Sequence, residues 1–408
     1  MTRKILILLL FITSATLVKA GGYQVNAMGI KQNGMGYIGT GFSLDASSVF
    51  FNPGAMSMMD QKYSFTGGIA GIFSNVTFQK ASPSTYQART DSKAGTPFNF
   101  YGAAKINDKL AVGIGVFTPF GNSLNWGSTW DGRYLITDLS FHVIDIQPTV
   151  SYKINKMISI GAGFNYLTGS VELNKALPVT NGTTEGTANL TGNTTSYGFT
   201  AGVMLQPTEK LGIGIMFRSR VEMKMDGGDA KFTVPASLAT NFPNTTFDAM
   251  LPLPSNLNIG FSYKVSEKLM LGLDLNIVYW STYDSLNFDF SKTTSALQNS
   301  HNPRLYKNTI AVRLGGQYKL NDKLTLRGGA YYDPSPITAD CFNPETPSLN
   351  QLGLTLGATY KFSSKFSADA SVGYLYGFQR DCSYPAANFS GTYKSEIILP
   401  GIGLSYNF

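Results

Sequence analysis

From residue 62 onward, apolar and polar residues alternate in runs that are joined in pairs by short polar turns. Six of these turns resemble one another, and they lie at residues 105–110, 153–158, 206–211, 264–269, 319–324 and 361–366. Between them are seven longer stretches rich in Gly, Pro, Ser, Thr and Asn, near residues 79–95, 119–141, 176–193, 226–254, 285–305, 334–348 and 381–391. This array predicts about fourteen antiparallel strands, with both ends on the short-turn side.

The alternation itself predicts that each strand has one apolar and one polar face. In the run at 350–362, Leu354 and Leu356 share one face and Thr355 lies on the other. Apolar residues facing lipid and polar residues facing a lumen are typical of an all-β outer-membrane barrel. A soluble β-sandwich would alternate in the same way, but the asymmetric loop lengths and the aromatic Phe408 on the last strand favour the barrel.

The composition and the first residues of the chain add one prediction, which is that the protein is exported. The chain has 408 residues, of which 14% are charged and 43% hydrophobic. Its single long apolar run, residues 5–12, follows Arg3 and Lys4. We therefore expect residues 1–20 to be a signal peptide that is cleaved after Ala20, rather than an uncleaved anchor. The remaining charge, about +4, is spread without blocks, so no nucleic-acid-binding surface is indicated.

Residues 21–61 do not follow the strand pattern. They are rich in Gly and Asn, contain Val49, Phe50 and several Met, and end near a turn at Asn52, Pro53 and Gly54. A linker could have this length, but its apolar residues favour a packed plug inside the barrel formed by residues 62–408. A proline-fixed turn can hold such a plug in one geometry, and asparagine can bond it to the wall.

These motifs together carry a resemblance to a known family. The N-terminal Gly-Met-Gly, Asp45-Ala46 and the Asn52-Pro53-Gly54 turn are similar to the hatch of FadL-type outer-membrane transporters, in which the turn is usually Asn-Pro-Ala. Further similar stretches cover nearly the whole mature chain, at residues 118–121, 132–134, 253–264, 280–283 and 306–336. The segment at 344–350 departs from the family pattern, which leaves the detail of that loop less certain.

The resemblance implies a function and a route. Members of the family are monomeric fourteen-stranded barrels that let long-chain fatty acids or other hydrophobic compounds, including aromatic hydrocarbons, diffuse across the outer membrane. It implies that ligand is captured in an external apolar groove, moves to a pocket beside the hatch, and leaves sideways through an interruption in the third strand. Pro119 and Gly121 are the candidates for that interruption, although they could simply terminate the strand.

Two sets of residues are candidates for ligand contact. The apolar external loop at 119–141 predicts a capture surface that includes Phe120, Leu124, Trp126, Trp130 and Tyr134, unless these residues pack against neighbouring loops. Four arginines are assigned to lumen faces and could bind a carboxylate head group, namely Arg218, Arg220, Arg313 and Arg327. Alternatively, they pair with Glu222, Asp274 or Asp369 to fill the barrel and fix the hatch. The same alternation through 209–225 assigns Val221 and Met223 to the lipid face.

The remaining chemistry is sparse. Cys341 and Cys382 lie in the last two external loops, where a disulfide or two free thiols are both compatible with an oxidising exterior. The only histidines, His142 and His301, lack a metal-ligand pattern, so we expect no metal, no cofactor and no enzymatic activity. A general porin and an adhesive barrel remain as alternatives to a plugged transporter, and the sequence does not distinguish fatty acids from hydrocarbons as ligands.

Overall fold

A computed structural model describes residues 22–180, 182 and 184–408, so the predicted signal peptide lies outside the described residues. The short helices are α1 (Ile30–Asn33), α2 (Ser48–Phe51) and the 3-10 helices η1 (Pro53–Met58), η2 (Ala236–Leu238), η3 (Trp280–Thr282), η4 (Ala339–Cys341) and η5 (Pro385–Ala387). None of the helices in this part of the chain is long and apolar enough to cross a membrane.

Twenty strand segments make up the sheet. They are β1 (Tyr63–Ala70), β2 (Phe73–Lys80), β3 (Gln87–Arg89), β4 (Phe98–Lys105), β5 (Leu110–Asn125), β6 (Asp138–Lys153), β7 (Ile158–Thr180), β8 (Glu185–Leu205), β9 (Leu211–Arg218), β10 (Val221–Thr233), β11 (Thr245–Leu253), β12 (Asn256–Lys264), β13 (Leu269–Val278), β14 (Ser285–Phe290), β15 (Ser300–Pro303), β16 (Thr309–Lys319), β17 (Leu324–Asp333), β18 (Gln351–Lys361), β19 (Phe366–Tyr384) and β20 (Phe389–Asn407).

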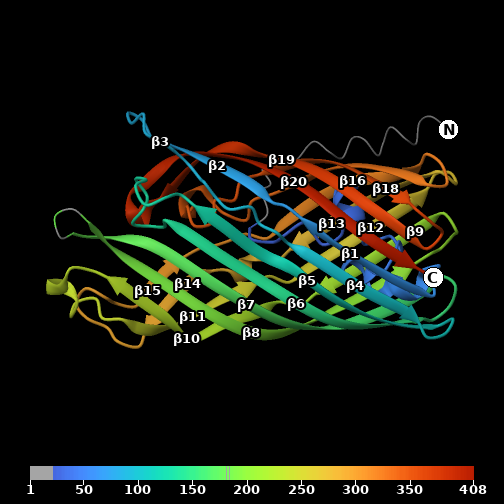
Figure 1. Ribbon diagram of the computed structural model, residues 1–408, viewed down its shortest axis with the longest axis horizontal. Coiled ribbons are helices and arrows are strands. Elements are labelled where there is room, and N and C mark those ends of the chain that lie inside the picture. The colour runs from blue at the N-terminus through green and yellow to red at the C-terminus, as the bar shows by residue number, and fades with distance from the viewer. Residues whose placement is uncertain (1–21, 181, 183) are drawn as a thin grey trace.

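These segments form a closed barrel of fourteen wall strands (Figure 1). Six wall strands consist of two consecutive segments each, namely β1–β2, β3–β4, β9–β10, β11–β12, β13–β14 and β15–β16. All neighbours are antiparallel, and β20 pairs with both β1 and β2, as in the register Ile69↔Ile402 and Phe73↔Ile398. The closure leaves the sheet without an edge and confirms the fold class expected from the sequence.

The six short turns lie at one end of the barrel and the long connections at the other (Figure 1). The third residue of each turn explains why the pattern repeats. In the first turn, the Asn107 side chain accepts hydrogen bonds from the backbone N–H groups of Lys109 and Leu110, both at 2.9 Å. Asn, Thr or Ser occupies the same position in the other five turns and accepts in the same way. Short polar side chains that satisfy the backbone locally are favoured in tight turns.

The wall has an apolar outer face and a polar lumen face. Leu354, Leu356 and Ile402 are 55–66% exposed on the outside, whereas Thr355, Asp274 and Asn276 are buried on the inside. One assignment was wrong. Val221 and Met223 point inward and are buried, and Arg220 is exposed and bonded to Glu222 at 2.9 Å. The chain leaves the strand at Ser219, between β9 and β10, and this one-residue slip reverses the faces of everything that follows.

Residues 22–59, which we call the N-terminal segment, lie inside the lumen and are almost entirely buried. Hydrogen bonds join them to wall strands around the whole circumference, including Tyr101 Oη to Met28 O at 2.8 Å, Ser159 Oγ to Gly54 O at 2.6 Å and Gly39 N to Asp274 Oδ2 at 2.9 Å. The segment therefore divides the barrel interior, with the long loops on one side of it and the short turns on the other.

The backbone of the N-terminal segment approaches the wall closely at glycines. A Cβ atom on Gly214 would lie 1.8 Å from Thr40 O, and one on Gly161 would lie 2.4 Å from Pro53 C. No larger residue fits at these positions. The repeated Gly-x-Gly pairs of the sequence thus serve to let a second layer of backbone lie against the inner face.

Candidate functional site

The third wall strand, β5, changes partners along its length. The first half of β5 pairs with β4, from Lys105↔Ala111 to Asn99↔Phe117. Its pairing with β6 shifts register between Phe117 and Phe120. Beyond that point the edge of β5 bonds to the N-terminal segment instead, through Val25 N to Pro119 O at 3.0 Å and Gly121 N to Tyr23 O at 3.1 Å. Because Pro119 has no N–H group, it cannot donate to a neighbouring strand, and the wall is not continued here.

A cavity of about 630 Å³ opens where β4 and β5 part. Its lining includes Leu375 and Leu399, which are buried on the lumen side, and also His142 on the outer face of β6. Residues 93–98 form one side of it within the wall, and Thr118 with residues 120–124 forms the other. The cavity therefore connects the inside of the barrel with its lipid-facing surface. Of the two residues predicted for the interruption, Gly121 lines this cavity, whereas Pro119 lines the smaller one described below.

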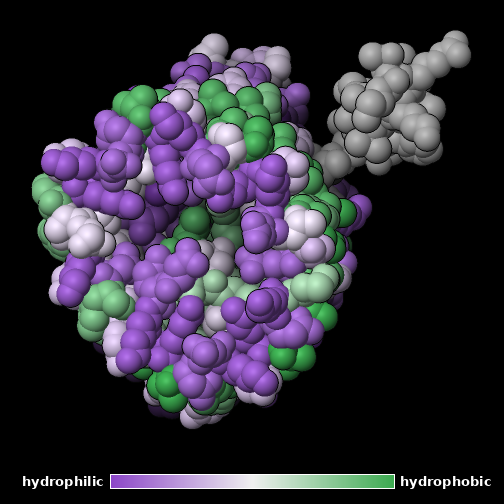
Figure 2. Space-filling model, turned by 90° about the vertical axis from the view of Figure 1, so that its right-hand side faces the viewer, coloured by the Kyte–Doolittle hydropathy of each residue, from purple (hydrophilic) through white to green (hydrophobic). Residues whose placement is uncertain are grey.

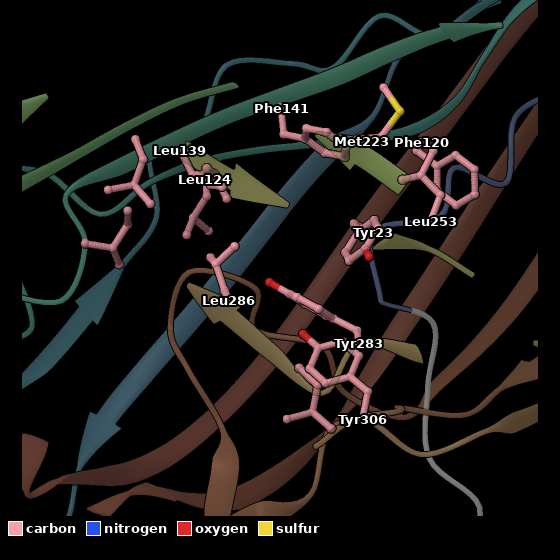
Figure 3. Packing of buried hydrophobic residues seen from close by; sticks show 14 of the residues in the cluster. Tyr23, Phe120, Leu124, Leu139, Phe141, Met223, Leu253, Tyr283, Leu286 and Tyr306 are labelled. Atoms are coloured by element: carbon pink, nitrogen blue, oxygen red, sulfur yellow. The ribbon is translucent and has the colours of Figure 1, made fainter. Parts of the chain in front are cut away.

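Above this cavity, the long loops enclose a buried aromatic cluster, part of which is drawn in Figure 3. Trp126 and Trp130 stack at 4.5 Å between ring centroids, and Trp130 also contacts Phe78 edge-on. Both tryptophans are buried, as are Phe120 and Leu124, whereas Tyr134 is 37% exposed. Of the five residues predicted for ligand capture, Phe120 and Leu124 line the cavity. The tryptophans pack against neighbouring loops and leave no open aromatic surface.

A bidentate ion pair anchors this loop cluster outside the membrane. Arg133 donates from Nε and Nη2 to the carboxylate of Glu185 at 2.7 and 2.8 Å, and the Tyr134 hydroxyl donates to the same carboxylate. These hydrogen bonds, first those from Arg133, lower the pKa of Glu185 to about 2. The carboxylate consequently stays ionised, and the pair stays formed, at any pH well above that value.

Sequence reasoning missed the aromatic residues at the start of the N-terminal segment. Tyr23 contacts Phe120, Phe141, Trp280 and Tyr283 with ring centroids 4.8–6.2 Å apart (Figure 3). Its hydroxyl donates to Pro252 O on β11. Tyr23 thus links the N-terminal segment to the top of the cavity. A lone tyrosine among glycines gave no pattern from which this contact could be predicted.

Two of the candidate arginines meet in a second, much smaller cavity beside the N-terminal segment, of about 10 Å³. Arg218 Nη1 donates to Asp145 Oδ2 at 2.9 Å and stacks on Phe50 at 4.6 Å from the ring centroid. Arg313 Nη2 donates to Asn26 and Asn276, and its guanidinium lies 4.8 Å from the centre of Tyr37. The space left holds about one water molecule. Each guanidinium bonds to protein groups through one nitrogen, whereas Arg218 Nη2 and Arg313 Nε are buried without a hydrogen-bond partner.

The other two candidate arginines lie elsewhere. Arg327 is buried nearer the short turns, where Nη1 donates to Thr359 Oγ1 and lies 3.9 Å from Asp369. Arg220 is on the outer surface, which excludes it from the lumen. Of the acids expected as partners, Asp369 lies near Arg327 and Glu222 binds Arg220 on the outer surface. Asp145, the partner of Arg218, was not predicted, because a single acid in an alternating strand looks like any solvent-facing residue.

Asn52, Pro53 and Gly54 sit at the contact between the N-terminal segment and the wall. Asn52 Nδ2 donates to Thr40 O at 2.9 Å and to Val203 O on β8 at 3.0 Å, and its Oδ1 accepts from Gly54 N at 3.0 Å. One fully buried side chain therefore satisfies backbone groups of the turn, of a distant part of the segment and of the wall.

Replacing Asn52 with Ala should loosen this contact. Three buried backbone groups would lose a partner, and each unsatisfied group costs about 1–3 kcal/mol. We expect a lower urea midpoint of unfolding and an increased leak of a small sugar into liposomes that contain the protein. Asn155→Ala is the matched control, because water can replace the two exposed hydrogen bonds that this turn would lose. It should change the urea midpoint little and leave the sugar leak unchanged. An unchanged sugar leak with Asn52→Ala would mean that this turn does not hold the lumen closed.

The remaining candidates are placed as follows. Cys341, in η4, and Cys382, in β19, are not joined by the disulfide that the sequence allowed. Cys382 is buried in the aromatic cluster, whereas Cys341 is partly exposed. His142 Nε2 lies 2.9 Å from Ser170 Oγ on the outer face of the wall. Within the described residues, no group of three or more His, Cys, Asp or Glu side chains could hold a metal ion.

Comparison with known proteins gives a consistent result for sequence and fold. The model of the family "Outer membrane protein transport protein (OMPP1/FadL/TodX)" matches residues 11–408. A long-chain fatty acid transport protein of Salmonella typhi is 25% identical over 386 residues, with 88% of each chain covered. A putative outer membrane protein of Neisseria meningitidis is 25% identical and covers 100% of this chain with 98% of its own length.

Solved structures show the same barrel. The crystal structure of a FadL homologue from Pseudomonas aeruginosa superimposes with a TM-score of 0.83 at 21% identity, covering 95% of this chain and 100% of the other. The toluene transporter TodX from P. putida superimposes with a TM-score of 0.74 at 17% identity, covering 94% and 99%. At these identities the likeness establishes the fold.

Proposed function

The chain belongs to the OMPP1/FadL/TodX family of outer membrane transport proteins, and on this basis we propose that it conducts hydrophobic compounds passively across the outer membrane, as a monomer. The observation that carries the proposal is the 630 Å³ cavity, which joins the interior to the lipid-facing side of the wall beside Pro119 and Gly121. A hydrophobic molecule that leaves through such an opening enters the membrane without crossing water.

The proposed route runs from the outer loops to the membrane. Ligand reaches the cavity beside Phe120 and Leu124, is held above the N-terminal segment, and leaves between β4 and β5. The N-terminal segment acts as a hatch, because its polar bonds to the wall close the lumen to water-soluble molecules. Each ligand methylene that leaves water contributes about 0.8 kcal/mol, so an apolar surface is sufficient to drive uptake down a gradient.

Liposomes that contain the mature barrel provide the test of this function. Labelled oleate, toluene and a small sugar are offered to the same preparation, and protein-free liposomes give the background. Uptake of oleate or toluene without uptake of the sugar is the expected result. Free passage of the sugar would indicate a general porin, and background values for all three probes would contradict transport of this kind.

Long-chain fatty acids are our proposal for the ligand class, with aromatic hydrocarbons as the alternative. Curated relatives named as long-chain fatty acid transport proteins favour the former. A fatty acid needs a cation for its carboxylate, and Arg218 and Arg313 are occupied by protein groups. Lys93, exposed on the lining of the large cavity, forms no ion pair with another described residue and is positioned to meet the head group.

Replacing Lys93 with Gln should distinguish the two ligand classes. We expect oleate uptake to fall a few-fold, because an exposed ion pair contributes only about 0.2–1 kcal/mol, and toluene uptake to stay unchanged. Lys394→Gln, an exposed lysine on β20 that does not line the cavity, is the matched control. Equal oleate uptake by all three proteins would remove Lys93 from the fatty-acid route and favour hydrocarbons.

A further inference from the structure

The end of the barrel that carries the short turns has a strong excess of positive charge. The six turns and residues 60–62 contain twelve lysines and five acidic residues. The lysines are Lys62, Lys105, Lys109, Lys153, Lys156, Lys210, Lys264, Lys268, Lys319, Lys323, Lys361 and Lys365, and the acids are Asp60, Asp108, Glu209, Glu267 and Asp322. In an outer-membrane barrel the short turns face the periplasm, so this is a basic periplasmic rim.

Backbone pairing places many of these lysines next to one another. The N–H of the first lysine of a turn donates to the carbonyl of a lysine on the preceding strand end, as from Lys319 to Lys268 and from Lys361 to Lys323, both at 2.8 Å. The same bond joins Lys105 to Lys62, Lys153 to Lys109 and Lys264 to Lys210. Like charges opposite one another in a sheet are destabilising, and the turn chemistry alone, which uses the third residue, does not require lysine at these positions.

The lysine positions continue the lumen face of their strands. Lys361 lies two residues beyond the buried Thr359, and Lys319 lies two residues beyond Gln317 on the inner side. The residues next to them, Leu320 and Phe362, are apolar and exposed on the outside. The charges therefore surround the periplasmic mouth of the lumen. Figure 2 shows this end, with hydrophilic residues forming a rim around a central hollow.

One side of this mouth is a hollow of about 390 Å³ with five cationic residues in its lining, namely Lys31, Lys319, Arg327, Lys361 and Lys365. The lining contains no Asp or Glu side chain. Two acids lie behind it, and both are engaged. Asp45 pairs with Lys31 at 2.6 Å, and Asp369 lies 3.8 Å from Lys31 and 3.9 Å from Arg327.

The three remaining lysines have no counter-ion among the described residues. Lys319, Lys361 and Lys365 take part in none of the ion pairs found among the described residues. Arg327 is 8% exposed, and its Nε atom is buried without a hydrogen-bond partner. An excess of three positive charges thus remains at the hollow, and a terminal carboxylate at Phe408 would reduce it only to two.

We propose that this periplasmic hollow binds a phosphate-bearing anion. Ammonium groups act as mobile point charges that suit phosphate, and a phosphate monoester carries about −1.5 to −2 charges at neutral pH, which matches the excess better than a single carboxylate does. The surrounding lysine rim would attract such an anion from a distance. A free phosphate in the periplasm carries a similar charge, and the phosphodiester head group of a phospholipid in the inner leaflet presents the same oxygens with one negative charge.

Calorimetric titration of the full mature barrel in neutral detergent at low salt tests the site. The probes are sodium phosphate, the short-chain lipid dihexanoylphosphatidylglycerol, and hexaglutamate. The site variant is Lys319→Gln/Lys361→Gln/Lys365→Gln. The control variant, Lys109→Gln/Lys153→Gln/Lys210→Gln, removes the same charge from the same rim but does not touch the hollow. Circular dichroism verifies that both variants remain β-barrels.

We expect phosphate to bind the native protein and the control variant, and its affinity for the site variant to fall by about tenfold or more, because direct charge-assisted contacts are lost. Competition by the lipid probe would identify a lipid head group as the source, and phosphate binding without lipid binding would identify a free anion. Equal weakening in both variants would overturn the site and leave only diffuse attraction by the rim. Binding of hexaglutamate but not of phosphate would overturn it in favour of an acidic protein partner.

Discussion

Filling the wall opening with two indole side chains, Ala94→Trp and Ser123→Trp, is expected to reduce uptake of oleate or toluene by at least about tenfold, equivalent to roughly 1.4 kcal/mol of added barrier. Both residues line the cavity, one from each side of the parting between β4 and β5. Neither belongs to the hydrogen-bonded contact between the N-terminal segment and the wall, so the lumen should stay closed.

The control for this prediction carries one indole elsewhere on the wall. Thr195 is exposed on the outer face of β8 and does not line the cavity. Thr195→Trp should leave uptake in liposomes unchanged. If the double variant also transported at the native rate, the ligand would have to leave by another path, such as along the barrel axis past the N-terminal segment.

The second large effect concerns stability. Replacing Arg218 with Met should lower the free energy of unfolding by about 3–5 kcal/mol, because the carboxyl group of Asp145, 1% exposed, would lose the positive charge that compensates it. The Asn165 amide, which donates to Asp145 Oδ2 at 2.8 Å, would remain but carries no compensating charge. Removing both charges in Arg218→Met/Asp145→Asn should restore much of the loss. Urea titration followed by tryptophan fluorescence measures both values.

Arg220 is the matched control for this experiment, two residues away on the same chain. It is paired with Glu222 on the surface, so Arg220→Met should change stability by less than about 1 kcal/mol. Oleate affinity measured on the stable double variant then separates the two interpretations of Arg218. An unchanged affinity supports a structural network, and a large loss would restore the arginine as a head-group ligand. If Arg218→Met were as stable as the native protein, the buried pair would not be needed to fill the lumen.

The strand array and the closed barrel could be predicted from the sequence because both depend on local rules. Period-2 alternation assigns faces within one strand, and Asn107 or Ser363 in a turn satisfies the backbone of that turn alone. The error at Arg220 has an equally local cause. The chain slips by one residue at Ser219, whose Oγ accepts a hydrogen bond from Phe199 N on the neighbouring strand. The alternation within one strand does not predict a contact with another strand.

Contacts between distant segments were harder to predict. The aromatic content of the loop at 119–141 was visible, but its packing depends on Phe78, Phe389 and Tyr393, which come from the two ends of the chain. The position of the wall opening was indicated by Pro119 and by the family resemblance. Its geometry depends on backbone hydrogen bonds that join β5 to Val25 and Tyr23, about a hundred residues earlier in the chain. The spacing of residues in the sequence does not predict these bonds.

The seam between the first and last wall strands has a consequence for biogenesis. Residues 22–59 bond to strands from β4 to β20, and the seam of β1 and β2 with β20 completes the cylinder around them. Once that seam has formed, the enclosed segment cannot reach its place from the side. We therefore expect residues 22–59 to pack against the wall before β20 pairs with β1 and β2. Closure of the wall and packing of its interior would then be coupled steps of folding.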